Sequence, residues 1–120
     1  GNLKSTRTII DIDDAMRSYW VAAKKGKIGE IYNIGGNKII EISKFLEILK
    51  KKSKVKITTM IDKNLLRKTD VTLQIPCTDK FTERTGWKQK YTLSESITNL
   101  LEYWRKKADE EVQRRSIGLI

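Results

Sequence analysis

Residues 92–108 read TLSESITNLLEYWRKKA, and this stretch shows the clearest structural pattern in the chain. Thr92 and Glu95 have the spacing of a capping box, in which each side chain bonds the backbone N–H of the other residue. Apolar side chains then recur at helical spacing along one stripe, which consists of Leu93, Ile97, Leu100, Leu101, Trp104 and Ala108. The stretch therefore predicts an amphipathic helix that begins near residue 93.

Two further amphipathic helices are predicted upstream. The first follows Asp13 and Asp14, which are good N-cap residues, and Gly26 is placed to end it. Its apolar face consists of Met16, Tyr19, Trp20 and Ala23. The second runs from about residue 42 to residue 52, and its apolar face consists of Ile42, Phe45, Leu46 and Leu49. We interpret the larger aromatic side chains on and beside these helices as core residues, namely Tyr19, Trp20, Trp87, Tyr91, Tyr103 and Trp104.

Short strands are predicted between the helices. Residues 30–34 and 55–60 alternate in polarity, and residues 38–40 fit a very short strand. Residues 78–84 favour a short helix closed by Thr85-Gly86. This order indicates an α/β fold with segregated pieces, three main helices and a few short strands.

Several apolar segments have no obvious partner in this inventory. Ile9, Ile10 and the apolar residues of 117–120 lie outside the predicted helices and strands. We therefore expect part of the core face to pack against another domain or another chain.

The formal net charge is +10, and its excess is concentrated in one third of the sequence. Residues 24–56 contain ten lysines and three glutamates, which gives +7. The two lysine clusters, at 24–27 and 50–52, fall where helices should end, and cations there complement the helix dipole. The pattern favours a solvated face over a nucleic-acid patch, although a basic nucleic-acid-binding module remains an alternative.

The composition excludes several kinds of chemistry. The chain has no histidine, which removes the commonest general base and the commonest zinc ligand. Cys77 is its only cysteine, so there is no internal disulfide and a reducing cytoplasm is expected. There is no signal-peptide pattern and no apolar run of the roughly 20 residues that a membrane span needs. The composition therefore favours binding over self-contained catalysis, and no catalytic or metal-ligating residue is predicted.

Three loop features are candidates for ligand binding. Gly35-Gly36 lies between a predicted strand and a helix, but it lacks the G-x-G-x-x-G or Walker pattern, so a plain turn is favoured. Arg7 and Arg67 are placed in loops, where a planar guanidinium would suit a diphosphate, and Asp70 could accept hydrogen bonds from ribose or base. From the residues alone, the favoured interpretation is that both arginines are ordinary surface charges or pair with nearby acids such as Asp11 and Asp62.

The sequence resembles the GDP-mannose 4,6-dehydratases, which are extended short-chain dehydrogenase/reductases. The matching segments follow the family order, at residues 1–7 (GNLKSTR), 11–14 (DIDD), 17–20 (RSYW), 29–35 (GEIYNIG), 66–71 (LRKTDV), 85–88 (TGWK) and 100–105 (LLEYWR). The resemblance covers about residues 1–107, whereas the tail at 108–120 has no counterpart. The sequence departs from the family pattern at Thr8-Ile9, Lys68 and Glu41.

The resemblance implies a C-terminal substrate-binding subdomain that holds a GDP-sugar. Arg7 and Arg67 would bind its diphosphate, Asp70 would lie near the ribose, and Asn2 would line the same pocket. The Rossmann domain with its NADP site, and the catalytic Tyr-x-x-x-Lys pair, would lie outside these 120 residues. The Rossmann domain is thus an expected partner, and a homo-oligomer is expected. The alternative within the family is a GDP-4-dehydro-6-deoxymannose reductase or a related epimerase/dehydratase.

Overall fold

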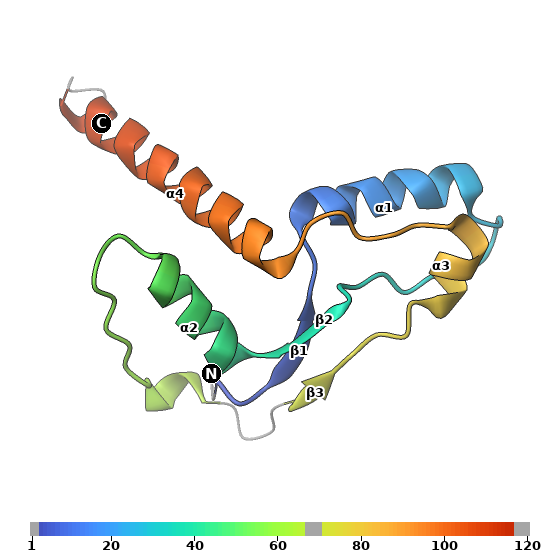
Figure 1. The fold of residues 1–120 in the computed structure, drawn as a ribbon, viewed down its shortest axis with the longest axis horizontal. Coiled ribbons are helices and arrows are strands. Elements are labelled where there is room, and N and C mark those ends of the chain that lie inside the picture. The colour runs from blue at the N-terminus through green and yellow to red at the C-terminus, as the bar shows by residue number, and fades with distance from the viewer. Residues whose placement is uncertain (1–2, 67–70, 117–120) are drawn as a thin grey trace.

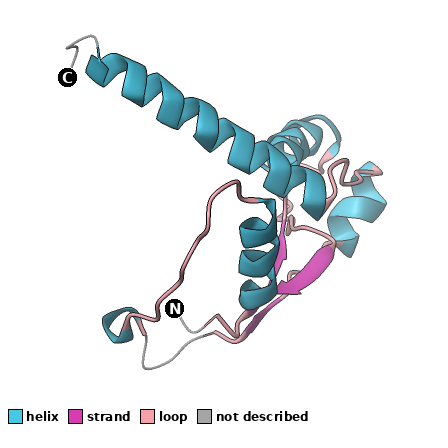
Figure 2. Ribbon diagram, turned by 60° about the vertical axis from the view of Figure 1, so that its left-hand side comes forward, coloured by secondary structure: helices cyan, strands magenta, loops and turns pink. Residues whose placement is uncertain are grey.

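The computed structural model describes residues 3–66 and 71–116. Its elements, in chain order, are β1 (Thr6–Ile9), α1 (Ile12–Lys25), β2 (Lys38–Glu41), α2 (Ile42–Lys52), a 3₁₀ turn at Lys63–Leu65, β3 (Leu73–Gln74), α3 (Asp79–Thr85) and α4 (Leu93–Ser116). The fold is α/β, as predicted, with four α-helices around a three-stranded sheet in the order β2-β1-β3 (Figures 1 and 2).

The central strand of the sheet is β1, which the sequence analysis left unassigned. It pairs antiparallel with β2, so that Arg7 lies opposite Ile40, and parallel with β3, so that Arg7 also lies opposite Gln74. The apolar pair Ile9-Ile10 therefore finds its place at the end of this strand and in the residue after it. Residues 38–40 form β2 as predicted.

Two predicted strands are wrong for this chain. Residues 30–34 and residues 55–60 have no regular secondary structure. The backbone of 31–36 makes no hydrogen bond with any other residue that the structure describes. An alternating pattern identifies a segment able to form a strand, but the ladder also requires a neighbouring strand edge, which is not supplied here.

The helices follow their local signals closely. The side chain of Asp11, rather than Asp13 or Asp14, caps α1, because its carboxylate accepts a hydrogen bond from the backbone N–H of Asp13 at 3.0 Å. The second helix has the predicted bounds, and Glu41 at its N-cap makes no capping hydrogen bond. The short helix α3 ends at Gly86, whose φ of 70° is the left-handed conformation that favours glycine.

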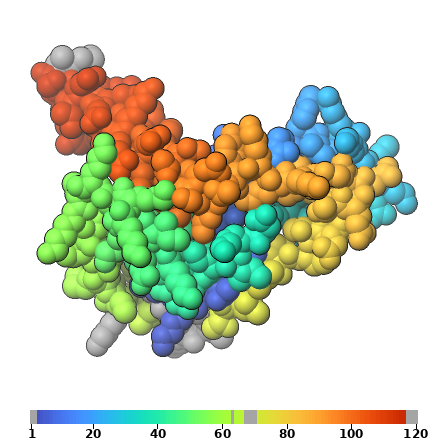
Figure 3. All heavy atoms as spheres, in the orientation of Figure 1, coloured from blue at the N-terminus to red at the C-terminus, as the bar shows by residue number. Residues whose placement is uncertain are grey.

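The capping box that opens α4 is confirmed. The Thr92 N–H donates to the Glu95 carboxylate at 2.8 Å, and the Glu95 N–H donates to the Thr92 hydroxyl at 3.3 Å. The helix then continues without interruption from residue 93 to residue 116. Its second half projects away from the rest of the molecule (Figures 1 and 3).

The buried core is small. Its buried apolar side chains, among the described residues, are Ile40, Phe81, Trp87 and Ile97. The rings of Phe81 and Trp87 lie 5.9 Å apart, and Tyr32 adds an edge-on contact with Phe81 at 5.8 Å. The radius of gyration is 18.2 Å, whereas a compact domain of this length has about 14 Å. The chain therefore has too little of its own core to form a compact domain.

The predicted apolar face of α1 is not covered. Met16 is 52% exposed, and Tyr19 and Trp20 are each 63% exposed. The opposite face, which carries Asp14 and Ser18, is the one that the chain buries. Tyr103 and Trp104 on α4 are exposed as well, so of the six aromatic residues interpreted as core only Trp87 is buried. Helical periodicity shows which apolar side chains share a face of a helix, but it does not show whether the rest of the chain covers that face.

Candidate sugar-nucleotide-binding site

Arg7 is the predicted binding residue whose surroundings the structure describes. It lies in the central strand β1 and is half-buried. Its Nη1 donates to the carbonyl oxygen of Thr6 at 2.9 Å, and its Nη2 donates to the carbonyl oxygen of Val71 at 2.5 Å. The guanidinium is thus held by two backbone carbonyls, and no carboxylate among the described residues pairs with its positive charge.

The other three predicted binding residues, Asn2, Arg67 and Asp70, lie outside the described residues. Their position in the sequence is nevertheless informative, because Val71 directly follows Asp70. The backbone N–H of Thr6 also donates to the carbonyl oxygen of Thr72 at 2.7 Å. Strand β1 is therefore hydrogen-bonded to Val71 and Thr72, which directly follow the predicted binding segment. Arg7 makes the bond to Val71.

Gly35 and Gly36 are explained by close packing. A Cβ added to Gly36 would lie 1.8 Å from the carbonyl oxygen of Ile9, and one added to Gly35 would lie 2.5 Å from Cγ of Pro76. Only glycine permits the backbone to approach β1 this closely. The lack of a side chain at these two residues allows the segment before β2 to pack against the end of the central strand, next to the start of α1.

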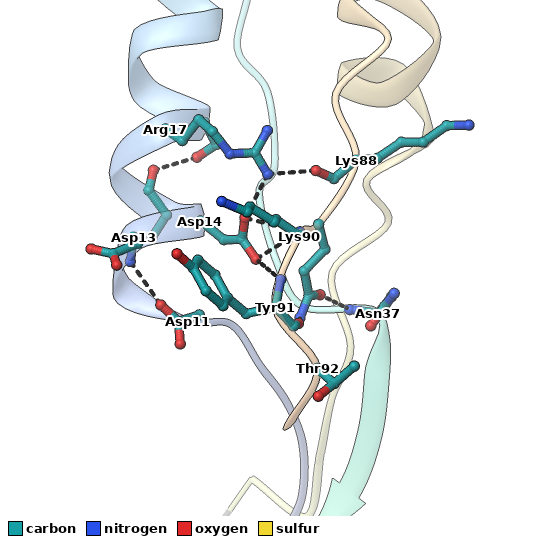
Figure 4. A network of polar contacts seen from close by, with 12 residues as sticks. Asp11, Asp13, Asp14, Arg17, Asn37, Lys88, Lys90, Tyr91 and Thr92 are labelled. Atoms are coloured by element: carbon teal, nitrogen blue, oxygen red, sulfur yellow. Dashed lines mark hydrogen bonds and ion pairs between the residues drawn. The ribbon is translucent and has the colours of Figure 1, made fainter. Parts of the chain in front are cut away.

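A polar network that sequence analysis did not anticipate lies around Asp14 (Figure 4). Asp14 is fully buried, and its carboxylate accepts hydrogen bonds from the backbone N–H groups of Lys90 and Tyr91, with the shortest contact to each at 2.9 Å. Arg17 adds an ion pair at 2.5 Å and also donates to the carbonyl oxygen of Lys88 at 2.6 Å. The network fixes the segment before α4 onto α1.

The electrostatics of this network favour the ionised carboxylate. Burial raises the pKa of Asp14, but the hydrogen bonds from Tyr91, Arg17 and Lys90, together with the charge of Arg17, outweigh it and leave the pKa below its usual value. The same segment reaches the sheet, because the Gln89 side chain accepts a hydrogen bond from the backbone N–H of Asn37 at 3.0 Å. The segment at 88–91 thus joins α1 and the start of β2 to α4.

No group of three or more His, Cys, Asp or Glu residues able to hold a metal ion is found among the described residues. Cys77 is exposed, and its thiol donates to the Asp79 carboxylate at 3.4 Å. A largely apolar hollow with a volume of about 510 Å³ lies between the end of β1, the start of α1, α2 and α4. No helix among the described residues is long and apolar enough to cross a membrane.

The two lysine clusters do not form one patch. Lys25 donates to the carbonyl oxygen of Thr85 at 3.2 Å, and Lys24 lies over the Trp20 ring at 4.6 Å, both at the end of α1. Lys52, at the end of α2, donates to the Thr98 hydroxyl at 2.8 Å. Figure 1 places these two helix ends at opposite sides of the molecule. The two lysine clusters are therefore separate in the structure.

The comparison with known proteins assigns the family. A family model described as GDP-mannose 4,6 dehydratase matches residues 1–100. The chain belongs to this family. Members of the GDP-mannose 4,6-dehydratase family are extended short-chain dehydrogenase/reductases, so the resemblance seen in the sequence motifs is confirmed. A G-x-G-x-x-G pattern, typical of dinucleotide-binding loops, does not occur in the 120 residues.

Two curated sugar-nucleotide enzymes are similar to most of the chain. The chain is 22% identical over 111 residues to GDP-6-deoxy-D-mannose reductase of Pseudomonas aeruginosa, covering 92% of the chain and 36% of the relative. It is 27% identical over 110 residues to human dTDP-D-glucose 4,6-dehydratase, covering 88% of the chain and 31% of the relative. The chain thus spans about a third of the length of these sugar-nucleotide enzymes.

Solved structures show the same fold over nearly the whole chain. The NADPH complex of RMD from Pseudomonas aeruginosa matches with a TM-score of 0.78 at 21% identity, covering 89% of this chain and 34% of that one. The UDP-glucose complex of UDP-glucose 4-epimerase from Thermotoga maritima matches with a TM-score of 0.68 at 28% identity, covering 90% and 34%. The α/β arrangement described above is therefore that of one third of an extended short-chain dehydrogenase/reductase.

Proposed function

We propose that this chain is the GDP-sugar-binding part of a cytoplasmic GDP-mannose 4,6-dehydratase. The observation that carries the proposal is the position of Arg7, which is half-buried in the central strand and bonded to Val71, next to the Arg67–Asp70 segment. A guanidinium without a carboxylate partner suits the diphosphate of a nucleotide sugar. Arg67 would share that diphosphate, Asp70 would bind the ribose, and Asn2 would complete the pocket.

The chemistry belongs to residues that this chain does not contain. In the intact enzyme a bound NADP would supply the hydride chemistry that converts GDP-mannose to GDP-4-dehydro-6-deoxymannose. This chain would contribute binding energy that orients the hexose, and it would be inactive alone. Relatives with either NADPH or NAD exist among the solved structures, so NADP is the finer part of the proposal.

The uncovered surfaces support the missing cofactor domain as a partner. The exposed face of α1 carries Met16, Tyr19 and Trp20, and the segment after it carries Ile28 and Ile31, which are 100% and 84% exposed. The unpaired alternating segment at 30–34 follows directly along the chain. An apolar helix face followed by an apolar segment that could form a strand but has no regular structure is what remains when the sheet that both would pack against is absent. We propose that the cofactor domain of the intact enzyme supplies that sheet.

A reductase acting on GDP-4-dehydro-6-deoxymannose is the second candidate. The relative named GDP-6-deoxy-D-mannose reductase matches 92% of the chain. Both candidates place a GDP-sugar against Arg7. They differ in the catalytic residues, which lie in the two thirds of the relatives that this chain does not span.

Calorimetric titration of the chain tests the proposal. We expect saturable binding of GDP and GDP-mannose, with weaker binding of dTDP-glucose and UDP-glucose. Arg7→Ala should weaken the binding about tenfold or more, since a charged hydrogen bond contributes about 1.5–3 kcal/mol. Arg114→Ala, on the exposed end of α4, is the matched control and should bind normally. Equal affinity for the guanosine, thymidine and uridine nucleotides would contradict the GDP preference. No binding of any of these ligands would contradict a usable site in this chain.

A further inference from the structure

Among the described residues, the second half of α4 makes no side-chain hydrogen bond or ion pair with another element. Arg105 makes the last side-chain hydrogen bond from α4 to another element, to the carbonyl oxygen of Lys52 at 3.0 Å. Beyond it, the side-chain hydrogen bonds and ion pairs described for residues 106–116 stay within the helix. Figures 1 and 3 show this half as a free arm. Isolated helices of this length are marginal in water, so a partner would stabilise it.

The arm carries a narrow apolar stripe. Trp104, Ala108 and Val112 recur at intervals of four residues and lie within about 40° of one line on the helix surface. Trp104 is 61% exposed and Val112 is 67% exposed. The small side chain of Ala108 lies at the centre of the stripe, where it would allow a second helix to approach closely.

The charges of the arm are arranged symmetrically about Ala108. Arg105-Lys106-Lys107 precede it and Asp109-Glu110-Glu111 follow it. At about 100° per residue, Arg105 and Asp109 flank one side of the stripe, Lys107 and Glu111 flank the other, and Lys106 and Glu110 lie on the back of the helix. Two such helices placed antiparallel, with a two-fold axis at Ala108, bring each flank opposite the same flank of the other copy, so that the basic residue of one copy lies beside the acidic residue of the other.

We propose that the projecting half of α4 is a self-association surface, which pairs antiparallel with the same segment of a second copy of this chain. Trp104 of each copy packs against Val112 of the other, the two Ala108 residues meet, and Lys107 pairs across the interface with Glu111. Flanking opposite charges of this kind set orientation and partner choice in paired helices. The inference does not depend on the proposed function.

Pairing within the helix is the competing explanation for these charges. Lys107 lies 3.2 Å from Glu110, and Arg115 lies 2.5 Å from Glu111. Both pairs are well exposed, with side-chain exposures of 49% and 38% in the first and 69% and 57% in the second. Exposed pairs stabilise a helix only slightly, so they can exchange for contacts with a second copy. They also explain nothing about the apolar stripe between them.

A charge exchange between two chains distinguishes these explanations. The mass of the chain in solution is measured by light scattering over a wide range of concentrations, for wild type, Lys107→Glu, Glu111→Lys and an equimolar mixture of the two variants. Each variant alone places like charges opposite each other and should shift association to about tenfold or more higher concentration. The mixture restores both opposite-charge pairs and should associate like wild type.

The back of the helix supplies the matched control. Lys106→Glu and Glu110→Lys make the same charge changes at the same spacing but away from the stripe, and they should associate like wild type. Circular dichroism on every variant checks that α4 stays helical. Three results would overturn the proposal: a wild-type chain that stays monomeric throughout, stripe-flanking variants that associate like wild type, or a mixture that fails to recover. A mixture that fails to recover would show that the variants lose association through an effect within the helix.

Discussion

The carboxylate of Asp14 accepts a hydrogen bond from the backbone N–H of Tyr91 at 2.9 Å, across 77 residues of sequence. A second bond, from the N–H of Lys90, makes the contact a clamp between the first turn of α1 and the segment before α4. Little apolar surface is buried in this chain. The fully buried carboxylate of Asp14, with its several hydrogen-bond donors, therefore contributes a large part of the contact that holds α1 against the segment before α4.

Replacing Asp14 by alanine should destabilise the chain. The N–H groups of Lys90 and Tyr91 would lose their shared acceptor, and Arg17 would lose its ion-pair partner. We expect a loss of about 2–3 kcal/mol in the free energy of unfolding, measured by urea denaturation. Asp13→Ala is the control, since this exposed neighbour loses only its interaction with the helix dipole, worth less than about 1 kcal/mol. Equal losses of unfolding free energy in the two variants would contradict a stabilising role for the hydrogen bonds of Asp14.

The same network predicts a dependence on pH. The pKa of Asp14 is lowered in the folded state, so its ionised form adds stability above the unfolded-state pKa of about 4, and this is lost as the pH falls through the lower folded-state pKa. The stability gap between wild type and Asp14→Asn should therefore narrow below about pH 4. Glu30 and Glu95 also have lowered pKa values, but they titrate in both proteins and cancel. A gap that stays constant into acid would exclude this assignment.

Gly36→Ala should be poorly tolerated, because the added Cβ would lie 1.8 Å from the carbonyl oxygen of Ile9. The backbone must move to relieve this clash, and overpacking of that kind costs about 1–3 kcal/mol. Gly29→Ala is the informative comparison, since its Cβ meets open space and the cost comes from its φ of 80° alone, about 1 kcal/mol. Thermal denaturation of both variants measures the difference. A Gly36 variant as stable as the Gly29 variant would show that the close approach is not required.

Local signals in the sequence predicted the helices well. The capping box at Thr92 and Glu95, the left-handed Gly86 and the bounds of α2 all depend on neighbouring residues, and all are confirmed. Strands were predicted less well, because a strand needs an edge to pair with. Residues 6–9 have such edges on both sides and form β1, whereas residues 30–34 pair with no strand in the part of the chain that the structure describes.

The candidate site was recognisable from sequence only through family motifs. Arg7 is placed beside Val71 by strand pairing between segments far apart in sequence, which no local pattern reveals. The Asp14 clamp was missed for the same reason, since an aspartate in the first turn of a helix is ordinarily explained by the helix itself. Its only signal was that Asp14 and Lys88 each lie in or beside a matched family segment.

The exposed aromatic face of α1 gives the last prediction. Trp20 is 63% exposed and Trp87 is 7% exposed. Trp87→Ala should therefore cost about 3 kcal/mol or more, as deletion of a core aromatic does. Trp20→Ala should cost less than about 1 kcal/mol in this chain, and it should reduce the binding of a dye specific for exposed apolar surface. If Trp20→Ala instead destabilised the chain as much as Trp87→Ala, the face would already be covered, and the proposed cofactor domain would have no open surface there to occupy.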